Sequence, residues 1–365
     1  MPTLNIERLQ TYLSKIFDAK VKIRTISELG KTEEAIEKGE LKGFGYGKPY
    51  LIEFEIKSET KSVVLGTMKP GGFGHDHFSD RAQSLLLAHS TFNSLPKHVR
   101  SVDVGAFTEE ESLKSVGDSL EFFLLTEKIE GLEYYNDLER IKANRNLVEL
   151  DKVRTKELSN YLVNIHSVKK NSPSLYIRRI RDLVGHGECI MGLLDSYPAD
   201  LDFTNEGELR EIEKKCIDWR WKIKKKVHRL SQVHGDFHPW NIMFRRGSDF
   251  TVLDRSRGEW GEPADDVTCM LVNYLFYSLQ AHRRLEGEFR TLFEIFIDNY
   301  LEKTEDEEIL SVMPPFYVWR CLVIASPIWY PNLDFDVRRK LFNFIHNMIE
   351  VERFDSKDVN SYLKC

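Results

Sequence analysis

The chain has 365 residues, of which 41% are hydrophobic and 30% are charged, and its formal net charge is −6. This composition is typical of a globular protein with one large domain or two lobes, and it excludes an intrinsically disordered chain. The negative net charge gives no overall attraction to nucleic acid or acidic lipid, so neither is expected as a partner.

The cysteines and the first residues of the sequence indicate the compartment. None of the five cysteines is paired at C-x-x-C spacing, which favours neither a zinc ribbon nor a disulfide framework. The stretch MPTLNIERLQTYLSKIF lacks the apolar core and cleavage site of a signal peptide, and no stretch of the chain reaches about 18 apolar residues. We therefore expect a soluble, cytoplasmic monomer or homodimer.

The first 130 residues alternate between strand and helix patterns. A glycine-rich bend, GFGYG, leads into a hairpin in which the strands PYLIEFEI and SVVLGTMK flank a polar turn. Hydrophobic periodicity predicts the remaining elements in chain order. They are a helix over residues 6–16, a strand over 21–26, a helix over 78–95, and strands near 99–107 and 120–129.

From Gly131 onward helical periodicity dominates. Two short apolar strands, residues 232–233 and 251–253, flank the loop HGDFHPWN of residues 234–241. The sequence thus predicts an α+β protein with a strand-rich N-terminal lobe (1–130) and a helix-rich C-terminal lobe (131–365). The densest basic run, residues 222–229, is interpreted as a solvated helix face rather than a phosphate-binding patch.

The loop HGDFHPWN allows two kinds of chemistry. In the first, His234, Asp236 and His238 would hold zinc, because imidazole and carboxylate are good zinc ligands. Metal hydrolases with such a short cluster need further ligands, and the other histidines form no second cluster downstream. A zinc-dependent hydrolase remains the weaker alternative.

In the second, the loop serves phosphoryl transfer. A carboxylate must lie beside the attacking hydroxyl, and an amide oxygen five residues later on the same loop can bind Mg²⁺. Asp236 and Asn241 have this D-x-x-x-x-N spacing, and Asp254 follows the next strand, 18 residues after Asp236. The pattern predicts a metal site between two short strands, with Asn241 and Asp254 as ligands.

The N-terminal part can supply the nucleotide site. A triphosphate needs a glycine-rich turn that lets the backbone approach the phosphates, and a lysine on the following hairpin strand. Gly43, Gly45 and Gly47 of GFGYG precede Lys69 in this order, with one strand between them. These residues are therefore predicted to bind ATP or GTP.

Taken together, these motifs resemble the aminoglycoside phosphotransferase and choline kinase superfamily, the small-molecule kinases with a protein-kinase-like, two-lobe α+β fold. The resemblance runs from about residue 43 to the C-terminal helices. Its most specific parts are HGDFHPWNIMF, VLDRSRGEWGEPADDV and the linker LLTEKIEG, and the helix that ends in YLVNIHS is a further similar feature.

The resemblance implies a role for each motif. Asp236 would be the catalytic base that orients or accepts the proton of the substrate hydroxyl, and residues 253–266 would be the metal-binding segment. The backbone of Thr126–Lys128 would hold adenine in a hinge over residues 126–131. His234 would support the loop, as would Asp266, for which a plain N-cap role is the alternative.

The chain departs from the family pattern at two places. The glutamate that normally pairs with the strand lysine is missing, and the nearest replacements are Asp80, 11 residues after Lys69, and Gln83. Arg255 follows the metal-binding aspartate where protein kinases have phenylalanine. Together with Arg257 it is expected to pair with Glu259 or Glu262, or else to reach phosphate.

The sequence does not identify the acceptor beyond a small molecule with a hydroxyl group. The acidic stretch of residues 195–213 could face a cationic acceptor or could be an exposed loop and helix start. Trp319 and Trp329 could form a cation-binding cage but are predicted to be core residues. The leading hypothesis is an ATP- or GTP-dependent phosphotransferase that uses Mg²⁺, and the alternative is a nucleotide-binding pseudokinase or regulatory module.

Overall fold

The structure is a computed structural model that describes residues 4–28, 49–71, 74–93, 99–122, 124, 126–255 and 257–365. The chain divides into two compact units, Met1–Thr126 and Glu127–Cys365. Each unit has its own hydrophobic core, so the two are described separately. No helix among the described residues has the length and apolar character needed to cross a membrane.

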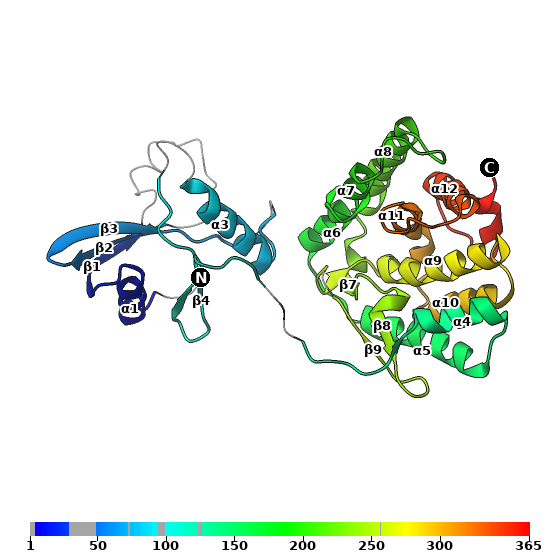
Figure 1. Cartoon of the computed structure of the whole chain (residues 1–365), viewed down its shortest axis with the longest axis horizontal. Coiled ribbons are helices and arrows are strands. Elements are labelled where there is room, and N and C mark those ends of the chain that lie inside the picture. The colour runs from blue at the N-terminus through cyan, green and yellow to red at the C-terminus, as the bar shows by residue number, and fades with distance from the viewer. Residues whose placement is uncertain are drawn as a thin grey trace. The chain divides into compact units, whose positions relative to one another are not determined.

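The N-terminal unit is built on a three-stranded antiparallel sheet in the order β1-β2-β3 (Figure 1). Leu9 and Leu13 of the first helix pack with Ile52 and Phe54 of the central strand to form its buried core. The Asn5 side chain accepts a hydrogen bond from the backbone of Arg8 (3.1 Å) and so caps the first helix. The described elements of the unit are α1 (Ile6–Ile16), β1 (Val21–Glu28), β2 (Tyr50–Ile56), β3 (Glu59–Leu65), α3 (Phe78–Phe92), β4 (Gly105–Phe107) and β5 (Leu113–Ser115).

Two strand predictions in this unit are wrong in extent. Only residues 105–107 of the predicted strand over 99–107 pair with a neighbour, β5. The described residues of 120–129 form no strand, and Leu120 and Leu124 are almost fully exposed. An alternating apolar pattern is not sufficient for a strand, because the strand also needs a partner for its backbone hydrogen bonds.

The C-terminal unit is mostly helical. Its helices are α4 (Tyr135–Asn144), α5 (Glu149–His166), α6 (Pro173–Gly185), α7 (Ile190–Asp195), α8 (Glu206–Ile223), α9 (Pro263–His282), α10 (Gly287–Thr304), α11 (Met313–Ala325) and α12 (Phe335–Glu350), with short 3-10 turns η1 (Val227–Arg229), η2 (Pro239–Asn241), η3 (Glu307–Ser311) and η4 (Val359–Leu363). Its strands are β6 (Leu132–Glu133), β7 (Ser231–Gln232), β8 (Ile242–Phe244), β9 (Phe250–Val252) and β10 (Trp260–Gly261).

Helix α9 is the centre of this unit. Every residue from Pro263 to Leu279 is buried, as expected for a helix that is apolar on all sides. It contacts α4, α5, α10, α11 and α12, and Figure 1 shows it crossing the middle of the unit between α11 and α10. A residue on α9 is therefore held rigidly on all sides.

The basic run of residues 222–229 is only partly the solvated helix face that its charge pattern predicts: Lys222, Lys225 and His228 are exposed, but the helix does not continue through the run. Helix α8 ends at Ile223, and Arg229 is only 4% exposed. Its guanidinium binds Glu262 (2.8 Å) and Asp306 (2.7 Å), which places a charged cluster under the start of α9. Glu262 also caps this helix through a hydrogen bond from the backbone of Ala264 (3.3 Å).

The candidate catalytic loop lies between two small antiparallel sheets, β6-β8-β9 and β10-β7. Strand β7 leads into the loop, η2 forms the last three residues of the loop, and β8 follows it. Strand β10, which pairs with β7, leads into α9. The loop is thus fixed by paired backbone at both of its ends.

Gly131 lies near the start of the C-terminal unit, directly before β6. Its φ is +148°, and a Cβ atom there would lie 2.7 Å from the carbonyl oxygen of Phe244. We expect Gly131→Ala to lower the free energy of unfolding by about 2 kcal/mol, because either β8 or the backbone of residue 131 must shift. Urea denaturation measures this change. Gly247→Ala (φ +75°, open space) is the control for backbone strain alone, and equal losses would contradict the steric argument.

Candidate active site

The turn that contains Asp236 is held from below by a buried carboxylate. Asp266, fully buried in the first turn of α9, accepts hydrogen bonds from the backbone N–H groups of His234 and Gly235, both at 2.7 Å. His166, the last residue of α5, contacts the same carboxylate at 3.1 Å and Tyr300 at 2.8 Å. Burial opposes the charge on Asp266, but the contact with His166 and the hydrogen bond from His234 lower its pKa.

Asp236 lies at the tip of this turn beside two arginines. One of its oxygens, Oδ1, accepts a hydrogen bond from Arg320 (2.6 Å) and forms an ion pair with Arg257 (3.0 Å), while Oδ2 is 3.5 Å from Nε2 of His238. Burial works against ionisation, yet His238 and the two guanidiniums hold the pKa of Asp236 well below its usual range. Asp236 is therefore a permanent carboxylate with a single oxygen, Oδ2, that is not already bound to an arginine.

The two arginines differ from what the sequence predicts. Arg257 pairs with Asp236 and stands 3.8 Å from Glu188, and its guanidinium lies over the ring of Trp319. Arg255 donates instead to the backbone carbonyls of Val233 and Glu259. The expected pairing with the side chains of Glu259 or Glu262 is thus wrong, because the loop folds back so that its carbonyls and Asp236 are nearer.

The predicted metal ligands have oxygen atoms of the right kind. The Asn241 amide donates through Nδ2 to the backbone carbonyl of Asp236 (3.1 Å), which leaves its Oδ1 as an acceptor. Asp254 adopts a left-handed conformation (φ +53°) just after β9, is exposed, and has no hydrogen bond or ion pair to any described residue. An amide oxygen and a free carboxylate fit the preference of Mg²⁺ for oxygen ligands.

The two histidines of the loop have structural partners. His234 is 2% exposed, packs edge-on against Phe237, and accepts from the backbone of Asp236 (3.3 Å). His238 accepts from the backbone of Trp240 at 3.2 Å, and Trp240 stacks on Tyr135. Across the part of the chain that the structure describes, no three His, Cys, Asp or Glu side chains group in a metal-binding arrangement, so the loop does not assemble the three zinc ligands.

A cavity of about 630 Å³ opens in front of Asp236 within the C-terminal unit. Asp236, Asp254, Arg257 and Arg320 line its charged end. The rest of the wall comes from α7, α9 and α11, from the segments next to α7 and after α11, and from the loop that follows Asp236. Its residues are Gly187, Glu188, Gly192, Leu193, Ser196, His238, Trp240, Cys269, Val272, Asn273, Trp319, Val323, Ile324, Ile328, Trp329 and Tyr330. The volume is sufficient for a sugar-sized molecule beside the carboxylate.

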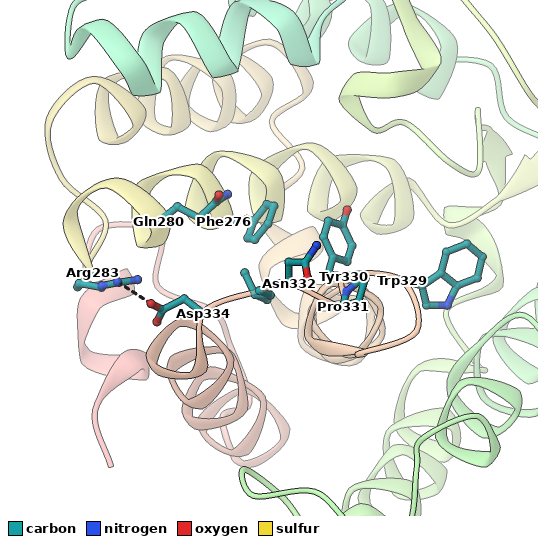
Figure 2. A pocket seen from close by; sticks show the side chains of 9 residues that line it. Phe276, Gln280, Arg283, Trp329, Tyr330, Pro331, Asn332 and Asp334 are labelled. Atoms are coloured by element: carbon teal, nitrogen blue, oxygen red, sulfur yellow. Dashed lines mark hydrogen bonds and ion pairs between the residues drawn. The ribbon is translucent and has the colours of Figure 1, made fainter.

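A second, more open hollow of about 470 Å³ continues along α9. Figure 2 shows Phe276 and Gln280 of α9 on one side, Tyr330 and Trp329 toward one end, and the Arg283–Asp334 ion pair (3.0 Å) at the other. Trp329 and Tyr330 line both spaces and so separate the hollow from the cavity at Asp236. Trp329 is 65% exposed, so its prediction as a core residue is wrong, whereas Trp319 is buried.

The residues predicted to bind nucleotide belong mainly to the N-terminal unit. Lys69 is exposed and lies four residues beyond the end of β3, not on the strand as predicted. Asp80 accepts from the backbone N–H of His77 (2.7 Å) and so caps α3. Gly43, Gly45 and Gly47 lie outside the described residues. Thr126 and Lys128 are exposed at the boundary between the units, where Lys128 pairs with Glu130 (2.6 Å).

Arg320 is the most important site residue that sequence reasoning missed. It links Asp236, the carbonyl of Gly235 and the buried carboxylate of Asp265. The sequence feature that could have identified it is a single charged residue in the otherwise apolar helix PPFYVWRCLVIA. A charge in such a helix is expected to be buried, and a buried charge needs a partner. His166 was recognised only as the end of a family-like helix, and its contact with Asp266 gives that position a physical reason.

The chain has a mixed α/β architecture with a mostly helical C-terminal unit, and the comparison with protein families defines its class. The profile of the phosphotransferase enzyme family matches residues 101–299, more than half of the chain. The chain therefore belongs to the phosphotransferase enzyme family. The match includes Asp236, Asn241 and Asp254 but begins after Lys69.

Several solved structures show similarity to this chain. An ethanolamine kinase from Plasmodium vivax is 13% identical, with 99% of this chain and 84% of that chain covered and a TM-score of 0.35. An amicoumacin kinase is 14% identical, with 92% and 91% covered and a TM-score of 0.42. The choline kinase LicA from Streptococcus pneumoniae is 12% identical, with 94% and 98% covered and a TM-score of 0.34. No curated protein matches the sequence.

Proposed function

We propose that this protein transfers the γ-phosphoryl group of a magnesium-bound nucleotide, ATP or GTP, to a hydroxyl group of a small molecule. The observation that carries the proposal is the placement of Asp236: a permanent carboxylate, fixed by Asp266 and Arg320, that faces a cavity also lined by Asp254. Membership of the phosphotransferase family supports the same chemistry.

In this proposal Asp236 binds the acceptor hydroxyl through Oδ2 and orients its oxygen toward the γ-phosphorus. The bond between this oxygen and the γ-phosphorus forms while the bond to the bridging oxygen breaks, the hydroxyl proton passes to an oxygen of the transferred phosphoryl group, and the nucleoside diphosphate leaves. Positioning accounts for most of the acceleration in such reactions. Arg257 and Arg320 keep the carboxylate ionised and fix its direction.

The nucleotide would be held by the residues that the sequence motifs indicate. Asn241 and Asp254 would bind Mg²⁺, which when bound neutralises charge on the phosphates. Lys69 and the backbone of Gly43, Gly45 and Gly47 would contact the phosphates, with Asp80 or Gln83 as the partner of the lysine. Thr126 and Lys128 would bind the adenine ring through their backbone, which makes residues 1–130 the nucleotide-binding lobe.

The direct test measures binding and transfer separately. Mg-ATP or Mg-GTP is expected to raise the melting temperature, and a panel of hydroxylated metabolites is expected to include one that gains phosphate, detected by ³¹P NMR. Binding without transfer to any acceptor would favour the pseudokinase alternative. Stoichiometric zinc in the purified protein, without a response to Mg-nucleotide, would favour the hydrolase.

Asp254→Ala is expected to weaken the binding of Mg-nucleotide about tenfold and to lower turnover as well, because a metal ligand serves both the ground state and the transition state. Isothermal titration with Mg-ATP measures the first effect. Asp249→Ala, which removes an exposed carboxylate from the β8–β9 turn, is the matched control. Unchanged affinity in the Asp254 variant would rule out Asp254 as a metal ligand.

A further inference from the structure

Asn273 has a buried polar atom without a partner and is one of the residues that line the cavity in front of Asp236. It lies on α9, is 4% exposed, and lines the cavity wall. Its Nδ2 donates to the carbonyl of Cys269 (2.8 Å), and its Oδ1 is buried without a hydrogen-bond partner. A buried amide oxygen without a partner is unfavourable, so a ligand that donates a hydrogen bond to it gains affinity.

Trp319 presents the complementary atom. It lies on α11, is 1% exposed, and lines the same cavity, and its indole Nε1–H is buried without an acceptor. The indole nitrogen can only donate, whereas the amide oxygen of Asn273 can only accept. A hydroxyl group satisfies either atom, because it both donates and accepts. A primary ammonium can satisfy only Asn273, and a quaternary ammonium satisfies neither.

The charges around the cavity do not favour a cationic acceptor. Asp236 is bound by two arginines, and Glu188 stands 3.8 Å from Arg257. Among the described residues that line the cavity, Asp254 alone is a carboxylate without an ion pair, and it is the proposed metal ligand. Of the acidic stretch over residues 195–213, the cavity wall includes only Ser196. Asp236 and Glu188 are thus paired with arginines, and Asp254 is assigned to the metal. The carboxylates of the acidic stretch do not line the cavity, so no carboxylate among the described residues of its wall remains to attract a cation.

The aromatic rings of the cavity are also occupied. The guanidiniums of Arg320 and Arg257 lie 3.9 and 4.9 Å from the centre of the Trp319 ring. Trp240 is stacked on Tyr135, and Tyr330 packs edge-on against Phe276. Trp329 is the remaining ring among those that line the cavity, and one ring does not make a cage for a quaternary amine.

The position of Asn273 along α9 suits a molecule with several hydroxyl groups. Asp266, Cys269 and Asn273 recur at helical spacing on one face of α9. Cys269 lines the cavity together with Asp236. Asn273 is one turn further, about 6 Å along the helix axis. A hydroxyl bound there would belong to the same small molecule as the hydroxyl at Asp236, a few bonds away.

We propose that Asn273 and Trp319 determine acceptor specificity, and that the acceptor is an uncharged molecule with several hydroxyl groups, of the sugar, cyclitol or nucleoside type. This inference rests on the proposed phosphotransfer function. Asn273 accepts from one hydroxyl of the acceptor and Trp319 donates to a hydroxyl oxygen, while Asp236 orients the hydroxyl that is phosphorylated.

The experiment compares two acceptor panels with wild-type protein and Mg-ATP: hexoses, pentoses, inositols and nucleosides against choline, ethanolamine and amino sugars. The highest kcat/KM is expected for an uncharged acceptor. For that acceptor, Asn273→Leu and Trp319→Phe are each expected to raise KM about tenfold with little change in kcat, since each removes one hydrogen bond. The matched control Asn299→Leu also replaces a buried asparagine, but away from the cavity, and is expected to leave KM unchanged.

The outcomes separate the inference from the function on which it rests. A preference for cationic acceptors, or an unchanged KM in both variants, overturns the inference while phosphotransfer stands. Transfer to no acceptor overturns both. If the variants fail to fold, monodeoxy analogues of the best acceptor replace them with wild-type protein. Removal of a hydroxyl group is expected to lower kcat/KM about tenfold at two or more positions other than the phosphorylated one. Deoxy analogues with the same kcat/KM as the parent acceptor overturn the inference.

Discussion

Replacement of Asp236 by asparagine is expected to lower kcat for phosphotransfer by about a thousandfold, while the Kd for Mg-nucleotide changes less than about threefold. The amide has nearly the same shape but carries no charge. It cannot hold the acceptor hydroxyl as an ionised oxygen does, and if its NH₂ group faces Arg257 and Arg320, the donors oppose one another. Steady-state kinetics and calorimetric titration measure the two quantities.

The pH profile of the wild-type protein distinguishes orientation from proton transfer. Because His238 and the arginines outweigh burial and hold the pKa of Asp236 far below neutrality, the carboxylate is a weak proton acceptor at pH 7. In wild type, kcat is therefore expected to show no decline between about pH 8 and pH 5 from protonation of Asp236. Asp249→Asn is the control. An Asp236 variant that retains more than a tenth of the wild-type kcat would contradict the proposed role.

The parts of the fold that the sequence predicts well are those governed by local periodicity. Helix α1 and strand β2 have the predicted bounds to within one residue, because alternation or helical spacing coincides with the buried positions Leu9, Leu13, Ile52 and Phe54. Strands β7 and β9 lie within one residue of the strands predicted on either side of HGDFHPWN, whereas β8, which directly follows the loop, is not predicted. Local patterns were sufficient because each of these segments buries one face on a neighbour in the same unit.

The sequence did not predict the interactions of buried charges. Arg229 was assigned to a solvated face and is buried between Glu262 and Asp306, which are 33 and 77 residues further along the chain. Arg320 meets Asp236 from 84 residues away. A charge pattern describes local solvation, whereas burial of a charge is decided by a partner that only tertiary folding brings close.

The site is partly predictable for the same reason. Asp236, Asn241 and Asp254 are close in sequence, so their spacing already indicated one shared site. Asn273 and Trp319 stand in apolar helices and resemble core residues in sequence. Their significance comes from single atoms, Oδ1 and Nε1, that remain without partners in the folded cavity. A periodic pattern in the sequence does not show which buried atoms will lack a hydrogen-bond partner.

Asp266→Asn is expected to lower the free energy of unfolding by about 3 kcal/mol and to disorder the catalytic turn. Both carboxylate oxygens accept backbone N–H groups, from His234 and Gly235. An asparagine has a single oxygen, so its NH₂ group must face one of these N–H groups in a fully buried place, and the charge that faces His166 is lost. Chemical denaturation at pH 7 measures the loss, with the exposed Asp298→Asn as control.

The pH dependence of this loss follows from the lowered pKa of Asp266, where the contacts with His166 and His234 outweigh burial. A carboxylate with a lower pKa in the folded state stabilises the protein fully above its unfolded-state pKa, about 3.9, and less as the pH falls toward the folded-state value. The difference between wild type and Asp266→Asn is therefore expected to be constant from pH 8 to about pH 5 and to shrink below about pH 4. A difference that grows as the pH falls would mean that Asp266 is protonated in the folded protein, and that a neutral group supports the turn.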